Sequence, residues 1–152
     1  MKKILVVLVG LGIVGFFAFA VLSQPKDQEL IAAALDDSVA AAAEGRPNPV
    51  LSNLSSDFKY GDETFFAGDI AKVIRDAKPT ILIVNKAAEI SGERAIVKTP
   101  VKLTMNYMGM SVDSTLPDVT IELRKETGVK WLFVPVPKWR ITSVRSESLP
   151  NY

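Results

Sequence analysis

Residues 95–107 alternate between apolar and polar side chains, and this alternation constrains the fold more than any other feature of the chain. The first set is Ala95, Val97, Thr99, Val101, Leu103, Met105 and Tyr107, and between its members stand Lys98, Pro100, Lys102, Thr104 and Asn106. A period of two places successive side chains on opposite faces of a strand, so the pattern predicts one long strand with one buried face. We expect Leu103→Ala to cost ~2–5 kcal/mol because Leu103 lies mid-strand on that face.

Other segments after residue 80 also favour strands. Val119, Ile121 and Leu123 alternate with Thr120, Glu122 and Arg124. The stretches "ILIVNKAAEI" and "WRITSVR" supply two more strands, and "VKWLFVPVPKW" extends a hairpin or covers the open end of the sheet. Pro100 has no N–H to donate, so it marks a sheet edge or a bulge that bends the sheet. The second half of the chain therefore predicts a curved antiparallel sheet.

The first half follows a helical period instead. Residues 27–44 predict a helix that Gly45 ends, with apolar positions at Leu30, Ile31, Ala34, Leu35 and Val39. Asn48 and Pro49 predict the N-cap and first turn of a short second helix. A third helix is expected from about Thr64 or Gly68 to Ala77, with a buried face made of Phe66, Ile70, Val73, Ile74 and Ala77. A turn at Gly61 separates the second and third helices.

Residues 4–22 are an unbroken apolar stretch of nineteen residues that follows Lys2 and Lys3. A helix of about 20 apolar residues crosses a bilayer, and preceding lysines favour a cytoplasmic N-terminus. We therefore expect residues 1–24 to be a single transmembrane anchor and residues 25–152 to be one domain outside the cytoplasm. Ala18 and Ala20 leave open a cleaved signal peptide, in which case the domain is secreted.

Gly10, Gly12 and Gly15 within this segment have the spacing of a dinucleotide-binding loop. That loop functions only between a strand and a helix that a second strand follows. Here Pro25 interrupts any helix after Gly15, and the next segment is alanine-rich and helix-like. No nucleotide cofactor is expected.

The composition excludes several function classes. The chain has no histidine and no cysteine, which removes Ser-His and Cys-His nucleophile systems and metal sites built on those ligands. We therefore expect no metal and no cofactor. With 18 basic and 17 acidic residues and no basic run, the chain has no electrostatic signature of nucleic-acid binding. The charges are unevenly distributed, since residues 27–77 are acidic overall and residues 119–146 are basic overall.

The order of these elements resembles the nuclear transport factor 2-like superfamily, which includes polyketide cyclase-like and ketosteroid isomerase-like proteins. The resemblance covers about residues 27–146 and rests on Asp57-Phe58, Gly68-Asp69 and Trp139-Arg140-Ile141. It implies an α+β cone in which N-terminal helices pack on a curved antiparallel sheet. This fold is used by enzymes, ligand-binding proteins and assembly modules. The catalytic groups of the isomerases have no counterpart here, because the first helix has no tyrosine and the buried strand face has no carboxylate.

No catalytic residue is therefore assigned. If the cone holds a ligand, the residues expected to line it are Tyr60, Tyr107, Trp131 and Trp139, because aromatic walls with a polar tip suit an amphipathic molecule. Ordinary core packing explains the same residues.

Two functions remain open. The first is a membrane-anchored, non-catalytic binding or assembly domain outside the cytoplasm. It would contact a protein partner, or form a weak homodimer, through the outward side chains of the sheet, which include Lys98, Lys102, Thr104, Glu122 and Arg124. The alternative is a secreted cyclase-like or isomerase-like enzyme, or a small-ligand-binding protein, that uses the cone pocket.

Overall fold

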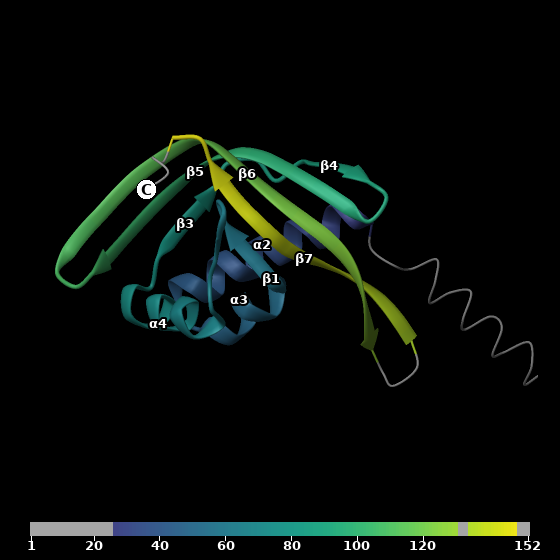
Figure 1. Ribbon diagram of the computed structural model, residues 1–152, viewed down its shortest axis with the longest axis horizontal. Helices are drawn as coiled ribbons and strands as arrows, with labels where there is room; N and C mark the ends of the chain where they lie inside the picture. Colours follow the sequence, from purple (N-terminus) through teal and green to yellow (C-terminus); the bar gives the residue numbers. More distant parts are fainter. Residues whose placement is uncertain (1–25, 131–133, 149–152) are drawn as a thin grey trace, which may run out of the picture.

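A computed structural model describes residues 26–130 and 134–148 of the chain (Figure 1). Three helices and seven strands follow one another in this part. The helices are α2 (Asp27–Ala43), α3 (Pro47–Asn53) and α4 (Ala67–Ala77). The strands are β1 (Leu54–Tyr60), β2 (Glu63–Thr64), β3 (Thr80–Ile83), β4 (Ala88–Ser91), β5 (Arg94–Tyr107), β6 (Met110–Lys130) and β7 (Val134–Ser146). The predicted α+β class is confirmed.

All seven strands form one sheet in the order β2-β1-β7-β6-β5-β3, and β4 also pairs with β5. The pairing of β1 with β7 is parallel, whereas the other pairs are antiparallel. The expectation of a purely antiparallel sheet is therefore wrong. Strands β5, β6 and β7 are consecutive in the sequence and pair antiparallel with their neighbours. Strands β2 to β6 and helix α4 lie between β1 and β7 in the sequence, so no hairpin constrains the relative direction of β1 and β7.

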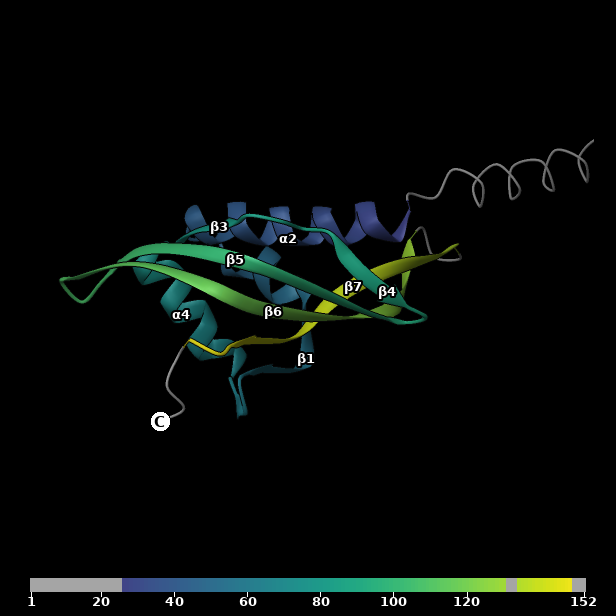
Figure 2. The same cartoon turned by 90° about the horizontal axis from the view of Figure 1, so that it is seen from above.

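The sheet is strongly curved, and the helices lie on its concave side (Figures 1 and 2). The register of β5 against β6 shifts between Thr99 and Val101, which confirms the bulge predicted at Pro100. The same bulge interrupts the strand pairing along the side of β5 that faces β3 and β4. The backbone N–H of Asn85 donates to Thr99 Oγ1 at 2.8 Å instead of to a backbone carbonyl. The stretch expected to form one strand is consequently split into β3 and β4.

The core lies between α2 and the concave face of the sheet. Its fully buried members include Ile31 and Leu35 of α2, Val97 of β5, Leu123 of β6 and Trp139 of β7. The predicted facing of the strands is confirmed, because the alternate positions from Ala95 to Val101 and from Val119 to Leu123 are buried.

Beyond Val101 the same face of β5 is only half-buried. Figure 1 shows the reason, since the β5–β6 hairpin extends past the helices. Leu103 is therefore not a fully buried core residue, and its burial favours a smaller cost of Leu103→Ala than the ~2–5 kcal/mol of a fully buried leucine.

The helix boundaries and one helix face differ from the expectation. Helix α3 begins at Pro47, which occupies the first turn, so Asn48 is not its N-cap. In α4 the buried residues are Ala71, Ile74 and Ala77, whereas Val73 is 39% exposed and Phe66 is 75% exposed. Phe66 precedes the first turn with an extended backbone, so its side chain is not on the helix face that packs.

None of the helices within residues 26–130 and 134–148 is both long and apolar enough to cross a membrane. The expected anchor at residues 4–22 lies outside the described residues.

Candidate functional site

The core between the helices and the sheet is made of buried apolar side chains. Five polar residues are buried in the described part of the chain, namely Ser38, Asn53, Ser55, Thr99 and Ser143, and none of them is ionisable. Asn53 Nδ2 donates to Ser38 Oγ at 3.0 Å and to the Ala34 carbonyl at 3.2 Å, so this pair joins α3 to α2. Among the residues described, the buried interior thus offers no acid or base for proton transfer.

Trp139 is a structural residue of this interior. It is 1% exposed, and its Nε1 donates to Asp27 Oδ1 at 3.0 Å. Lys125 Nζ lies 3.0 Å from the same carboxylate oxygen and 5.9 Å from the centre of the indole ring. The hydrogen bond from Trp139, and then the one from Lys125, lower the pKa of Asp27 below its usual range. Together these contacts fasten the start of α2 to β6 and β7.

Tyr60 lies at the end of β1, where it is 37% exposed. Its ring meets the ring of Phe65 edge to face, with centroids 6.1 Å apart, and burial raises the pKa of its hydroxyl. Tyr107 is half-buried at the tip of the β5–β6 hairpin, where it pairs with Met110.

The structure does not bring these aromatic residues together. Tyr60 pairs with Val144 of β7. Val144 is five residues from Trp139 on the same strand, so about 16 Å of strand separates the positions of Tyr60 and Trp139. Val144 pairs with Ile121, and Tyr107 lies opposite Met110, so about 35 Å of strand separates the levels of Tyr60 and Tyr107. Trp131 lies outside the described residues. Ligand binding by the four residues stays a prediction.

The convex face of the sheet, called the outer face below, carries an unusual arrangement of charge. Arg94 of β5 pairs with Arg124 of β6, and Arg124 pairs with Arg140 of β7, so three arginines lie side by side on neighbouring strands. We call these three residues the arginine row. Like charges directly opposite one another destabilise a sheet, so this row requires compensation.

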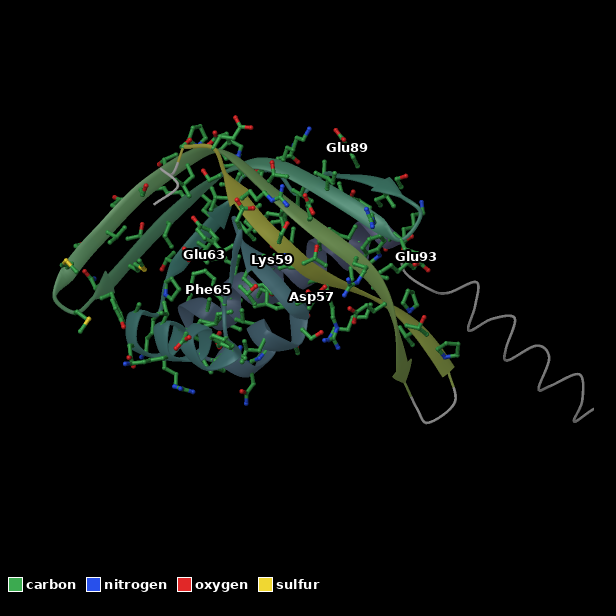
Figure 3. The ribbon with its side chains drawn as sticks, viewed as in Figure 1. Asp57, Lys59, Glu63, Phe65, Glu89 and Glu93 are labelled. Atoms are coloured by element: carbon green, nitrogen blue, oxygen red, sulfur yellow. The ribbon has the colours of Figure 1, made fainter. Side chains whose placement is uncertain are left out.

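Two carboxylates supply part of that compensation. Asp57 of β1 accepts from both terminal nitrogens of Arg124, at 3.2 and 3.3 Å. Glu126 Oε1 lies 3.2 Å from Arg124, and its Oε2 lies 2.9 Å from Arg140 Nε. Figure 3 shows Asp57 beside β7, from where its side chain reaches Arg124 across that strand. Arg94 has no carboxylate within ion-pair distance among the residues described.

The excess of positive charge extends beyond the arginine row. Lys138 pairs with Glu126, and burial together with repulsion from Arg140 lowers its pKa. By cross-strand register the bases of the outer face are Lys59, Arg94, Lys98, Lys102, Arg124, Lys138, Arg140 and Arg145, and its acids are Asp57, Glu89, Asp113, Glu122 and Glu126. Lys98, Lys102, Thr104, Glu122 and Arg124 therefore lie on the face that the sequence predicted for them.

Sequence reasoning identified the basic character of this half of the chain but not the arginine row. The row depends on which residues stand opposite one another, and the bulges that set this register are not visible in the spacing of the arginines.

An open groove of about 350 Å³ lies where the β4–β5 turn meets the β6–β7 hairpin. Its lining mixes opposite charges with two prolines and consists of Gly92, Glu93, Lys125, Glu126, Thr127, Pro135 and Pro137. No group of three potential metal ligands occurs in the part of the chain that the structure describes.

Comparison with solved structures places the chain among proteins of the nuclear transport factor 2-like fold. It matches a nuclear transport factor 2-like protein from Cytophaga hutchinsonii with a TM-score of 0.65 and 11% identity, covering 82% of this chain and 100% of the other. A second match, of unknown function in nutrient uptake from Rhodospirillum rubrum, has a TM-score of 0.63 and 15% identity over 79% and 98% of the two chains.

A third match is provisionally named a scytalone dehydratase, from Novosphingobium aromaticivorans, with a TM-score of 0.57 and 12% identity over 77% and 80%. No protein-family profile matches the chain, and no curated protein sequence matches it. Identities this low establish the fold and leave the function to be argued from the residues.

Proposed function

We propose that this protein is a non-catalytic binding or assembly domain that a single N-terminal segment holds at a membrane, outside the cytoplasm. The domain contacts a protein partner through the outer face of its sheet.

One observation carries this proposal: the core on the concave side of the sheet is apolar, and the polar groups buried in the described part of the chain are hydroxyls and one amide. Acid–base catalysis needs an ionisable group placed against the substrate, and the described interior provides none. The outer face, in contrast, carries the eight basic and five acidic side chains named above.

The chemistry of the outer face defines the kind of partner. Arg94, Lys98 and Arg145 are exposed there and have no carboxylate within ion-pair distance among the described residues. Arginine combines a planar set of donors with an apolar stem and is enriched in protein interfaces. The outer face therefore suits a polar partner that carries surplus acidic groups.

Membrane attachment rests on residues 4–22, with nineteen apolar residues after two lysines. Because α2 begins at Asp27, only a few residues would separate the anchor from the domain. The domain would then stay close to the membrane, where tethering raises the local concentration of partners in the same bilayer.

The alternative is a secreted enzyme or ligand-binding protein of the cyclase or isomerase type. The exposed Tyr60 and Phe65 rings favour it, because they place apolar surface and a hydroxyl next to each other. One of the structurally similar proteins is provisionally named a dehydratase.

Native mass spectrometry of the detergent-purified full chain distinguishes these functions. The proposal predicts the mass of the polypeptide alone, or of a multiple of it. A co-purifying small molecule that Tyr60→Ala releases and the exposed control variant Val84→Ala retains would contradict the proposal and support the alternative.

A further inference from the structure

Strand β6 is longer than its neighbour on one side. Strand β7 ends at Ser146, which pairs with Val119, whereas β6 begins at Met110. Residues 110–116 of β6 thus pair with β5 on one side, and no described strand pairs with them on the other. We call residues 110–116 the free edge. At about 3.3 Å per residue its seven residues extend for about 23 Å.

An unpaired edge exposes a row of backbone N–H and C=O groups that can accept another strand. Figure 1 shows this part of the hairpin projecting beyond the helices, at the opposite end of the molecule from the start of α2. The free edge is therefore accessible to an added strand, which would lie beside β6 beyond the end of β7.

The side chains of the free edge alternate in burial and define what an added strand must present. Val112, Ser114 and Leu116 are half-buried on the concave side, whereas Ser111, Asp113 and Thr115 are exposed on the outer face. A strand in this position has apolar side chains on its concave side, because cross-strand neighbours share a face.

Two exposed apolar side chains lie at the hairpin tip, next to the free edge. Met108 is 83% exposed and Met110 is 64% exposed. Exposed large apolar side chains are typical of interaction surfaces, and methionine adapts to varied partners.

Two residues oppose pairing of the free edge with a second copy of itself. Asp113 stands at its centre, so the symmetric antiparallel register places two carboxylates opposite each other. Pro117 follows directly and has no N–H to contribute. The same carboxylate favours a partner with a basic residue at the matching position, which makes Asp113 a determinant of specificity.

We propose that the free edge binds an extended segment of another protein by strand addition, with alternating apolar residues and a lysine or arginine opposite Asp113. Asp113 belongs to both the free edge and the outer face. Strand addition uses the backbone of the free edge, whereas the proposed partner contact uses charged side chains of the outer face, so either one can fail without the other.

The test uses the full chain in detergent and a synthetic seven-residue peptide, matched in length to the free edge. The peptide has valine at odd positions, threonine at the second and sixth, and lysine at the fourth; a second peptide has glutamate instead of lysine. Binding is measured by fluorescence anisotropy, and its location by backbone hydrogen exchange. We expect the lysine peptide to bind about fivefold more tightly than the glutamate peptide and to slow exchange in residues 110–116.

Asp113→Lys should reverse the preference between the two peptides, whereas Asp37→Lys, the same charge change on an exposed position of α2, should leave it unchanged. Absence of protection in residues 110–116, or equal binding of both peptides to the native chain and to Asp113→Lys, would overturn the proposal. Concentration-dependent protection without peptide would indicate a second copy as the occupant. Binding only after removal of residues 149–152 would indicate the chain's own C-terminus.

Discussion

At the scale of single residues, Trp139 shows how a predicted ligand-binding residue acquires a structural explanation. Its indole is buried in the core, and its one polar atom is satisfied by Asp27. The sequence shows an aromatic residue on a strand and an acidic residue at a helix start, but the two are 112 positions apart. Spacing could not reveal this contact, because the packing of α2 across the sheet creates it.

Substitution of Asp27 tests this contact. Asp27→Ala leaves the buried indole N–H without its acceptor and should lower the free energy of unfolding by about 1–3 kcal/mol. Asp27→Asn keeps a neutral acceptor and should cost less. Both values come from chemical denaturation at neutral pH, and equal costs for the two variants would contradict the role given to the hydrogen bond.

The same residue predicts a pH dependence. The pKa of Asp27 is lower in the folded chain than in the unfolded chain, so its ionised form stabilises the fold above the ordinary aspartate value of about 3.9. This contribution is lost as the pH falls through the lowered pKa. Denaturation curves across the acid range should show the stability of the native chain decreasing more steeply than that of Asp27→Asn. Parallel pH profiles would contradict the lowered pKa.

The depth of burial along the sheet gives a third prediction. Leu123 is 2% exposed, so Leu123→Ala should cost about 2–5 kcal/mol. Leu103 lies on the same face but beyond the helices, and we expect Leu103→Ala to cost about 1–2 kcal/mol. Lys102→Ala, on the outer face, is the control and should have little effect. A cost for Leu103→Ala equal to that for Leu123→Ala would show that the hairpin is covered.

At the scale of elements, regular alternation and turn residues were sufficient to predict most of the strands and the three helices. The side chains of β5 alternate as expected, and α2 ends just before Gly45, whose positive φ matches its expected role as the helix stop. The parallel entry of β1 beside β7 and the arginine row were not predictable, since both depend on register between distant segments. The amphipathic pattern of α4 predicted two residues of its buried face wrongly. Phe66 lies before the helix begins, and Val73 is exposed rather than packed with Ala71, Ile74 and Ala77.

Two glycines test the helix boundaries. Gly45 follows α2 with a φ of +72°, a conformation that a side chain disfavours, so Gly45→Ala should lower stability by about 1–2 kcal/mol. Gly68 lies in the first turn of α4 with open space around it, and Gly68→Ala should raise stability by about 0.4–1 kcal/mol. Thermal denaturation of both variants measures this. A stabilising Gly45→Ala would contradict the left-handed end of α2.

At the scale of the whole molecule, the fold class could be predicted from the sequence, but the features from which the function is argued could not. The apolar core and the charged outer face come from the combined placement of α2 and seven strands, and no motif in the sequence encodes either feature.

Membrane attachment has its own prediction. Lys2, Lys3 and the apolar residues 4–22 should retain the intact chain in the membrane fraction, with the domain accessible to protease added from outside the cytoplasm. Mass spectrometry of the purified protein locates its N-terminus. A mature N-terminus at Val21 or Gln24 would show that the segment is cleaved and the domain is released.

Site-specific photo-crosslinking in the native membrane tests the central claim most directly. A photoreactive residue replaces Lys98 or Arg145 on the outer face, or Asp37 on the exposed side of α2 as the matched control, in the full-length chain. The account predicts protein adducts from Lys98 and Arg145 and few or none from Asp37. Equal adducts from all three positions, or none from the outer face of a chain that retains a small molecule, would contradict a partner-binding role for the sheet.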